Sequence, residues 1–256
     1  MKKQKVFDAY SLYYNAFYED KDYISEAETI KKLLERYSGK NIKSVIDLGC
    51  GTGKHDTLLH NSWKSVQIDG VDLSEGMIEK AIENAKGTNI NYTVGDIRFF
   101  RNDKKYDVAM SLFHVMSYQN TNDDILNSFK TARTLLSENG LFLFDSWYGP
   151  GVLTDKPSVR VKKAFMDGKE LVRIAKPTMH ESENIVDVNY EVIIIDGNNK
   201  EIDRITEVHS MRYFFKPEIE NYLNIAGFEL LDCLDCRSLG QTSFDSWTAY
   251  FVARAV

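Results

Sequence analysis

The chain has 256 residues, of which 43% are hydrophobic and 27% are charged, a composition typical of a globular protein with a sizeable core. Its 32 basic and 38 acidic side chains give a formal net charge of −6, which disfavours a nucleic-acid partner because phosphate backbones recruit basic surfaces. The sequence has no apolar run of the roughly 18 to 20 residues that a membrane helix needs, and its start is too polar for a signal peptide, so we expect a cytoplasmic protein without a membrane partner.

The first part of the chain alternates between helical and strand patterns. Residues 25–37 place apolar side chains at helical spacing, with acids early and bases late, as the helix dipole favours. Further helices are predicted after Ser74, the expected N-cap, and over about 122–136. Strands are predicted at 44–48, 66–73, 90–94, 106–112 and 141–145. Nearly apolar strands that alternate with helices are typical of a parallel sheet covered on both faces.

Period-two patterns replace this alternation after Gly149-Pro150-Gly151. Strands separated by Asp-Gly turns are predicted at 159–165, 171–175, 186–195 and 202–214, as in an antiparallel insertion. A helix at 216–226, ended by Gly227, precedes two strands at about 228–234 and 246–254 that we expect to rejoin the main sheet. We therefore predict three parts: an α/β core with an N-terminal lid at 1–150, an insertion over the ligand edge at 151–214, and 215–256 completing the core sheet.

The cysteines point away from disulfides and metals. Cys50, Cys233 and Cys236 cannot all pair, and three thiols in a chain of this length do not make a disulfide framework. Cys233 and Cys236 form a CxxC pattern, but no second Cys or His pair with metal-ligand spacing accompanies it in the sequence. We predict reduced structural thiols and no metal site.

The most specific signal is the glycine-rich run that follows the first predicted strand. A phosphate-binding P-loop is excluded because His55 follows Gly53-Lys54 where Ser or Thr is required. The dinucleotide fingerprint Gly-x-Gly-x-x-Gly fits poorly, because Lys54 occupies the position of its third glycine. What remains is Asp-x-Gly-x-Gly-x-Gly, with Asp47, Gly49, Gly51 and Gly53.

This run resembles motif I of the class I S-adenosylmethionine-dependent methyltransferases. The resemblance implies that Asp47 serves the methionine ammonium of the cofactor, through water or backbone. In that family an acid ending the second strand binds both ribose hydroxyls; Asp72, 19 residues after Gly53, fits this role better than Asp69 in mid-strand. The run Gly95-Asp96-Ile97-Arg98 resembles the family's adenine site, with Asp96 accepting from the amine and Ile97 packing on the ring.

The same resemblance implies the remaining assignments to the cofactor. They are Tyr14, as part of an N-terminal lid, and the residues that adjoin the motifs, Cys50, Leu73, Met77 and Phe113. The predicted fold is thus a Rossmann-like class I methyltransferase sheet with an antiparallel β insertion after strand five, and the predicted cofactor is S-adenosyl-L-methionine.

A narrower resemblance extends over nearly the whole chain to the nucleotide-sugar N,N-dimethyltransferases of the desosamine and mycaminose type. It is carried by the aromatic N-terminus, the Asp145–Tyr148 run, the β insertion and the run His209-Ser210-Met211-Arg212. It implies a small-molecule acceptor, N-methylation of an amino group on a nucleotide-linked sugar, and a homodimer as a family expectation. The Asn/Asp-Pro-Pro-Tyr motif of methyltransferases that act on nucleic acids and protein glutamine is replaced by Ser111-Leu112-Phe113-His114.

His114, just past the fourth strand, is the predicted catalytic residue, which orients or deprotonates the amine. Tyr118, Trp147, Tyr148, His209 and Arg212 are the predicted acceptor-binding residues. Two alternatives stay open at this point. One is a methyltransferase for another small acceptor, such as an amino acid, a carboxylate or a hydroxyl compound, and the other is a non-catalytic module that binds the cofactor.

Overall fold

The computed structural model describes residues 13–18, 20–198 and 200–256, and the chain divides into two compact units. The larger, called the core unit here, comprises Asp22–Asp155 and Tyr213–Val256. The smaller, called the insertion unit, comprises Lys156–Arg212 together with the described residues before Asp22. Each unit has its own cluster of buried apolar side chains.

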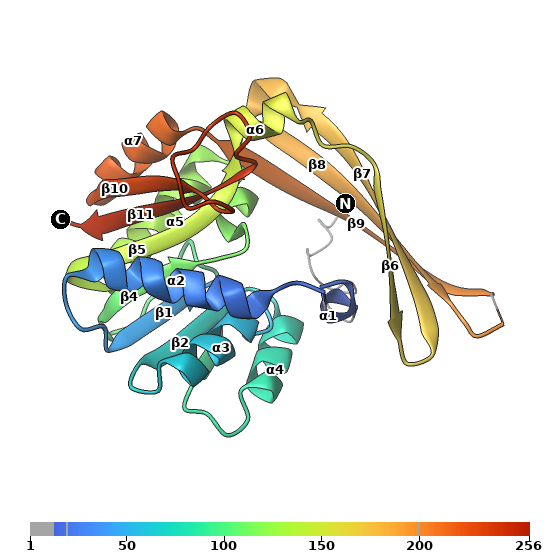
Figure 1. The fold of residues 1–256 in the computed structure, drawn as a ribbon, viewed down its shortest axis with the longest axis horizontal. Helices are drawn as coiled ribbons and strands as arrows, with labels where there is room; N and C mark the ends of the chain where they lie inside the picture. The colour runs from blue at the N-terminus through green and yellow to red at the C-terminus, as the bar shows by residue number, and fades with distance from the viewer. Residues whose placement is uncertain (1–12, 19, 199) are drawn as a thin grey trace. The chain divides into compact units, whose positions relative to one another are not determined.

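The core unit is built on a single sheet (Figure 1). Its strands run in the order β3 (Asn91–Val94), β2 (Gln67–Asp72), β1 (Ser44–Leu48), β4 (Tyr106–Ser111), β5 (Leu136–Tyr148), β11 (Thr248–Ala255) and β10 (Phe228–Asp235). The strands from β3 to β5 pair in parallel, whereas β11 is antiparallel to both β5 and β10. The predicted parallel sheet is confirmed, and it brings the carboxyl ends of β1, β2, β4 and β5 to one edge.

Helices cover both faces of this sheet (Figure 1). They are α2 (Tyr23–Ser38), α3 (Lys54–Ser62), α4 (Glu75–Asn84), α5 (Asn122–Leu135), α6 (Gly149–Thr154) and α7 (Lys216–Ala226), with a 3₁₀ turn η2 (Val115–Tyr118). The apolar stripes of α5 and α7 pack in one buried cluster, and those of α2 and α3 pack in the other. Ser74 caps α4 as predicted, because its hydroxyl accepts from the Met77 N–H.

The insertion unit is an antiparallel sheet. Its strands are β6 (Arg160–Met166), β7 (Lys169–His180), β8 (Ile185–Ile195) and β9 (Glu201–Phe214), each paired with the next, and it also contains α1 (Tyr14–Phe17) and the 3₁₀ turn η3 (Glu181–Glu183). Phe17, Leu171, Val192 and Ile194 form its buried centre. The last two residues of β9 belong to the core unit, where they pair with the end of β5.

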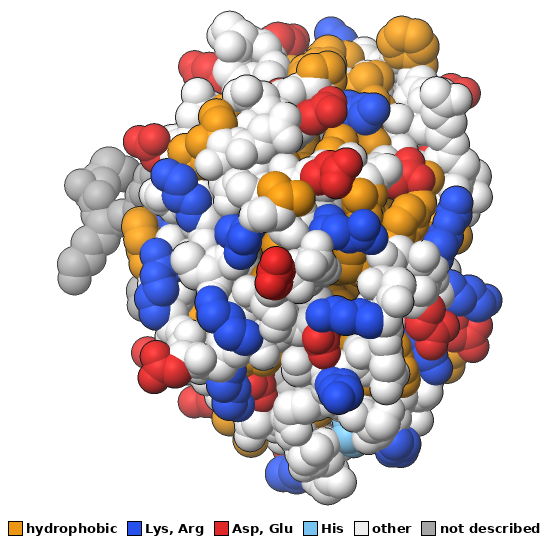
Figure 2. Space-filling view, turned by 90° about the vertical axis from the view of Figure 1, so that its left-hand side faces the viewer, with side chains coloured by type: hydrophobic (Ala, Val, Ile, Leu, Met, Phe, Trp, Pro, Cys, Tyr) orange, Lys and Arg blue, Asp and Glu red, His pale blue; other side chains and the backbone are white. Residues whose placement is uncertain are grey.

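Two of the predicted strands are too short. The strand predicted at 171–175 extends over Lys169–His180. Because β6 begins at Arg160 opposite Ala175, the later residues of β7 pair with β8 on one side, and Pro177, which has no N–H to donate, is tolerated on this open edge. The strand predicted at 141–145 extends over Leu136–Tyr148, because it continues through polar residues that carry no strand pattern. No helix among the described residues is long and apolar enough to cross a membrane. On the face shown in Figure 2, basic and acidic side chains are interspersed.

Candidate active site

A glycine loop leads from β1 to α3 at the carboxyl edge of the sheet. The N–H groups of Gly49 and Cys50 donate to the Val71 carbonyl at 2.7 and 3.0 Å, so the loop is held against β2. Gly49 has φ +94°, and a Cβ there would lie 2.5 Å from Val115 Cγ1. Gly53 has φ +67°, and a Cβ there would collide with the Tyr92 hydroxyl. Both positions therefore need glycine, and the loop leaves backbone free to approach a ligand closely.

Asp72 ends β2 beside this loop. Its Oδ2 accepts from the Gly51 N–H and its Oδ1 from the Ser74 N–H, both at 2.9 Å, so the carboxylate is fixed in orientation. Burial raises the pKa of Asp72. A carboxylate has about four lone-pair directions, so room is left for two hydroxyl donors. The neighbouring Leu73 side chain is 61% exposed and offers an apolar surface at the same edge.

Asp69, the rival acid on β2, serves the fold instead. Its Oδ1 accepts from Asn91 Nδ2 at 2.8 Å, and its Oδ2 accepts from Lys104 Nζ at 2.8 Å and from the Tyr106 hydroxyl at 2.6 Å. The side chain is buried with both oxygens engaged. The geometry therefore favours Asp72 over Asp69 as the ribose ligand.

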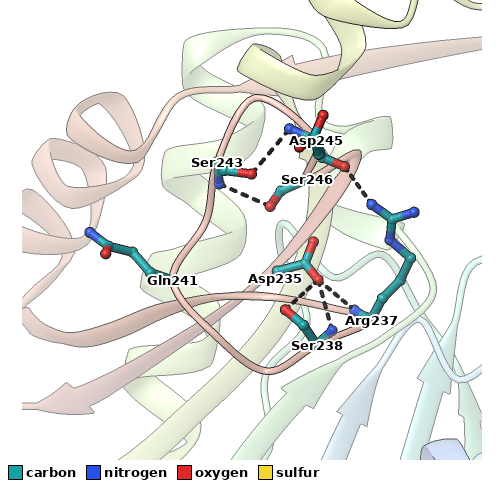
Figure 3. Close-up of a pocket in the computed structure, with 7 residues that line it drawn as sticks. All are labelled: Asp235, Arg237, Ser238, Gln241, Ser243, Asp245 and Ser246. Carbon is teal, nitrogen blue, oxygen red and sulfur yellow. Dashed lines mark hydrogen bonds between the residues drawn. The ribbon is translucent and has the colours of Figure 1, made fainter.

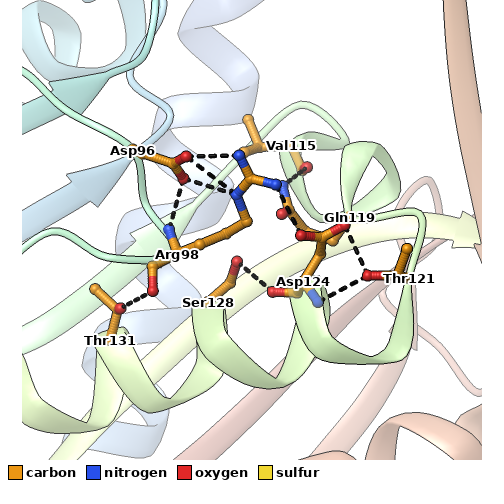
Figure 4. A network of polar contacts seen from close by, with 8 residues as sticks. All are labelled: Asp96, Arg98, Val115, Gln119, Thr121, Asp124, Ser128 and Thr131. Atoms are coloured by element: carbon orange, nitrogen blue, oxygen red, sulfur yellow. Dashed lines mark hydrogen bonds and ion pairs between the residues drawn. The ribbon is translucent and has the colours of Figure 1, made fainter.

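Arg98 fixes the acid that follows β3 (Figure 4). Its Nη2 donates to Asp96 Oδ2 at 2.6 Å, its Nε donates to both Asp96 oxygens, and its Nη1 donates to Asp124 Oδ1 at 2.7 Å. The hydrogen bonds from Arg98 hold the pKa of Asp96 below its usual value, so this carboxylate is an acceptor at neutral pH. Ile97, between them, is nearly buried in the core. The sequence pattern alone predicts no role for Arg98.

The other predicted cofactor residues lie on the same elements. Asp47 is the next-to-last residue of β1, with 3% of its surface exposed, and its Oδ1 has no hydrogen-bond partner among the described residues. Cys50 is half-buried within the glycine loop, and Met77 is buried in the first turn of α4. Tyr14 lies in α1, but its side chain falls outside the described part of the chain.

A strained turn after β4 presents His114. Phe113 and His114 adopt φ of +62° and +67°, a conformation that non-glycine residues avoid and that gathers at functional sites. The His114 N–H donates to the Asp145 carboxylate at 3.1 Å, and His114 Nδ1 lies 2.5 Å from Asp145 Oδ2 at the end of β5. The Asp145 carboxylate lies close to Nδ1 but is not aligned for a hydrogen bond with it. This proximity favours the tautomer with the proton on Nδ1, which leaves the Nε2 lone pair available as a base.

A cavity of about 400 Å³ opens beside His114 within the core unit. Its lining includes three acids, Asp22, Glu26 and Asp145, together with the bases His55, His114 and Arg237. His55 Nε2 contacts Glu26 Oε2 at 2.9 Å. The cavity also contains Phe113, one of the predicted cofactor residues. Carboxylates at this position suit an acceptor that carries an amino group.

A second polar cavity of about 420 Å³ adjoins the chain between β10 and β11 (Figure 3). Asp235 Oδ1 accepts from the N–H groups of Arg237 and Ser238 and from the Ser238 hydroxyl, which orders this loop. Gln241, Ser243, Asp245 and Ser246 complete the lining. Arg237 lines both cavities.

None of the predicted acceptor residues is among those that line the first cavity. In the core unit Trp147 packs edge-on against Trp247 at 4.8 Å, the Tyr148 hydroxyl accepts from Thr242 Oγ1 at 3.3 Å, and Tyr118 ends η2. In the insertion unit His209 is 1% exposed with its Nε2 3.1 Å from Glu207 Oε2, and Arg212 is also buried. The acceptor roles of these residues stay predictions.

Sequence reasoning missed Asp22, Glu26, His55 and Arg237 in the first cavity. One signal could have found the first two, since Asp22 precedes a helical pattern as its N-cap and Glu26 follows one turn later. His55 directly follows the glycine motif, but Arg237 comes from a loop that carries no recognisable pattern. Among the described residues no three His, Cys, Asp or Glu side chains are arranged to hold a metal ion, and the three cysteines are free thiols.

Comparison with known proteins agrees with this geometry. Residues 45–140 match the family described as "Methyltransferase domain". The chain is 25% identical over 223 residues to the dTDP-3-amino-3,4,6-trideoxy-alpha-D-glucopyranose N,N-dimethyltransferase of Streptomyces venezuelae, covering 87% of this chain and 90% of the relative.

Two solved structures share the fold. The sugar N-methyltransferase KedS8 from Streptoalloteichus sp. ATCC 53650 superposes with a TM-score of 0.81 at 19% identity, covering 100% of this chain and 96% of that one. An S-adenosylmethionine-dependent methyltransferase from Clostridium acetobutylicum superposes with a TM-score of 0.80 at 22% identity, covering 95% and 96%. The chain thus has a methyltransferase domain over residues 45–140 and the fold of known S-adenosylmethionine-dependent methyltransferases.

Proposed function

We propose that the protein transfers methyl groups to the amino group of a nucleotide-linked amino sugar. The observation that carries the proposal is the acid-lined cavity with His114 at its wall. The similarity to an amino-sugar N,N-dimethyltransferase over 87% of the chain supports the same class of acceptor.

The cavity wall can hold and deprotonate an amine. The carboxylates of Asp22, Glu26 and Asp145 attract the protonated form of an amino sugar. Only the neutral amine has the lone pair needed for attack, so one proton must leave first. His114 Nε2 receives that proton while Asp145 stabilises the resulting imidazolium through Nδ1.

S-adenosylmethionine supplies a methyl group already activated by its positively charged sulfur. Most of the catalysis therefore falls to proximity and orientation, which the glycine loop, Asp72 and the cavity wall provide. A second transfer to the same nitrogen requires a second deprotonation, which His114 performs in the same way once it has released the first proton to solvent.

Arg237 supports a nucleotide-linked acceptor. Its side chain lines both the acid-lined cavity and the polar cavity beside it. A guanidinium between the two can bind the phosphates while the amino group reaches His114. The hydroxyl and amide groups of Ser238, Gln241 and Ser243 offer further polar contacts.

The test is a mass-spectrometric assay of the purified protein with S-adenosylmethionine and a panel of acceptors. The panel contains dTDP-linked 3-amino and 4-amino sugars, free amino acids, carboxylic acids and hydroxyl compounds. We expect one or two added methyl groups on an amino sugar, and none on its hydroxyl analogue. Methylation of only an amino acid, acid or alcohol would retire the sugar assignment, and cofactor binding without any turnover would indicate a non-catalytic module.

The remaining roles can be tested with the same preparation. Alanine variants of Tyr14, Tyr118, Trp147, His209 and Arg212 are expected to raise the KM for the acceptor or cofactor they bind. A cytoplasmic location and a homodimer are further proposals, which cell fractionation and light scattering of the purified protein would test.

A further inference from the structure

A second buried acid lies behind the glycine loop. Asp56 sits in the first turn of α3, three residues after Gly53, and its side chain is 0% exposed. Its carboxyl group is within hydrogen-bonding reach of the Asp47 carboxyl at the end of β1. Neither acid has a basic side chain as a salt-bridge partner among the described residues. Motif I accounts for Asp47 but leaves Asp56 unexplained.

The oxygens of this pair need a proton to be satisfied. Both Asp56 oxygens and Asp47 Oδ1 are buried, and in the described part of the structure none of them has a well-formed hydrogen bond. The Tyr92 hydroxyl lies near enough to Asp56 to lower its pKa, but this offsets only part of the effect of burial. Two carboxylates cannot donate to each other, and a buried unpaired carboxylate is costly. If one of the two keeps its proton, its O–H donates to the other and both groups gain a partner.

The surroundings also favour a retained proton. Burial raises the pKa of Asp56 to about 7, and burial followed by the charge of Asp56 raises that of Asp47. The groups that face the pair from neighbouring elements are Cys50 in the loop, Asp72 on β2, Tyr92 on β3 and Asp145 on β5. Asp72 and Asp145 add negative charge beside the pair, whereas Cys50 and Tyr92 are neutral. Burial is also the chief cause that raises the pKa of Cys50 and of Tyr92.

We propose that Asp56 is a positioning residue for the cofactor, which shares a proton with Asp47 so that the pair presents one negative charge to the ammonium group of S-adenosylmethionine. The cofactor has two positive groups, its ammonium and its sulfonium, and this buried pair lies at the carboxyl end of β1, next to the glycine loop. Asp56 acts through Asp47, because it is fully buried and has no surface of its own to offer a ligand. The inference rests on cofactor binding, so it is independent of which acceptor is methylated.

Three ligands separate the two positive groups in a calorimetric titration of the full chain. S-adenosylmethionine has both, S-adenosylhomocysteine keeps the ammonium but lacks the sulfonium, and 5′-deoxy-5′-methylthioadenosine lacks both. A cation binds better to the singly ionised pair than to the fully protonated one, so ligand affinity rises as pH increases through the pKa at which the pair loses the first of its two protons. Between about pH 5.5 and 7.5 we expect the first two ligands to gain up to about tenfold in affinity per pH unit, and the third to stay constant.

Two variants at position 56 should move this profile in opposite directions. Asp56→Leu leaves the Asp47 carboxylate without a hydrogen-bond donor, so Asp47 holds its proton more tightly. The rise in ligand affinity then shifts to higher pH. At neutral pH this costs about tenfold in affinity for the two ammonium-bearing ligands. Asp56→Asn removes the second acid but keeps an N–H donor for Asp47, so the rise in ligand affinity shifts to lower pH. At neutral pH the affinity stays within about twofold of that of the parent.

Asp107→Asn is the matched control, because Asp107 is an acid on neighbouring β4 whose carboxylate accepts from the Lys43 N–H at the start of β1. It should reproduce the parent profile. Coinciding profiles for the parent and Asp56→Asn would overturn the proposal, even if Asp56→Leu failed to fold. An equal loss of 5′-deoxy-5′-methylthioadenosine binding in Asp56→Leu would also overturn it, and a loss confined to S-adenosylmethionine would contradict the assignment to the ammonium.

Discussion

The two ends of the active site are built in different ways. At the proposed cofactor end, near β1 and β2, the candidate residues lie in a contiguous glycine loop and at the end of β2, where Asp72 stands. At the acceptor end, near β4 and β5, the cavity is assembled from α2, α3, the turn after β4 and the β10–β11 loop. Backbone geometry therefore defines the first end, and side chains far apart in the sequence define the second.

The acceptor end can change in evolution more easily than the cofactor end. A site made from one short segment tolerates little variation, because glycine is required at positions such as 49 and 53. A cavity made from separate segments can change its acceptor through substitutions in any of them without disturbing the cofactor. Variants of the two ends should accordingly separate cofactor affinity from turnover.

The largest effect is expected at the acceptor end. His114→Ala removes the proposed base, so kcat should fall by about 10²- to 10⁴-fold while cofactor affinity stays nearly unchanged. Steady-state kinetics on the methylated acceptor and calorimetry with S-adenosylmethionine check both parts. His180→Ala is the control, since His180 also contacts an aspartate, Asp187 at 2.9 Å, but lies in the insertion sheet. Equal turnover in His114→Ala and the parent would remove His114 from the mechanism.

The next effect belongs to the cofactor end. Asp72→Ala should cost about 2–4 kcal/mol of cofactor binding, because two charge-assisted hydrogen bonds to the ribose are lost. Calorimetry with S-adenosylhomocysteine measures the loss directly. At saturating cofactor, kcat should recover, in contrast to His114→Ala. Undiminished affinity would show that the ribose is bound elsewhere.

A smaller loss of cofactor affinity is expected from the glycine loop itself. Gly49→Ala forces a Cβ against Val115 and a side chain into a left-handed conformation, so binding should weaken by about 1–3 kcal/mol. Gly39→Ala is a matched control, because Gly39 has φ +63° but no atom within 4 Å of its Cβ position. Both variants carry the backbone strain, and only Gly49→Ala should weaken calorimetric binding. Equal affinities for the two would show that Val115 yields and that the close approach is unimportant.

The sequence predicts the features that lie within one segment and misses those that join distant segments. The order of helices and strands, the glycine loop and the preference for Asp72 over Asp69 follow from local patterns, because each lies within one segment. The pairing of His114 with Asp145 joins residues 31 apart in the sequence, and it depends on the parallel pairing of β4 with β5. Arg237 reaches the cavity from a loop without periodicity, so only the folded chain reveals it.

The buried acids Asp56 and Asp69 show a second limit. Sequence alone places Asp69 in mid-strand and Asp56 just after the glycine motif, and it does not tell a buried acid from a solvated or capping one. In the structure Asp69 accepts hydrogen bonds from Asn91, Lys104 and Tyr106. Asp56 has no basic partner among the described residues. Burial, which depends on packing across the whole core unit, decides between these roles.

The smallest effect is expected from Asp69, which lies on the same strand as Asp72 but serves the fold. Burial, the largest single influence, raises the pKa of Asp69, but hydrogen bonds from Asn91, Lys104 and Tyr106 together leave it below the usual value. A lowered folded-state pKa adds stability above the unfolded-state pKa of about 4, and this stability is lost as pH falls through the folded-state value. Asp69→Asn should therefore lower the free energy of unfolding by about 1–2 kcal/mol at neutral pH, with the difference shrinking in acid.

Urea unfolding of Asp69→Asn and the parent at neutral and acidic pH measures this difference, and calorimetry should give equal cofactor affinity for both. The two acids of β2 lie three residues apart, yet only Asp72 touches the glycine loop, through the Gly51 N–H. A drop in cofactor affinity in Asp69→Asn comparable to that in Asp72→Ala would mean that the ribose site extends along β2. Stability loss with intact binding would instead confine the cofactor site to the carboxyl edge of the sheet.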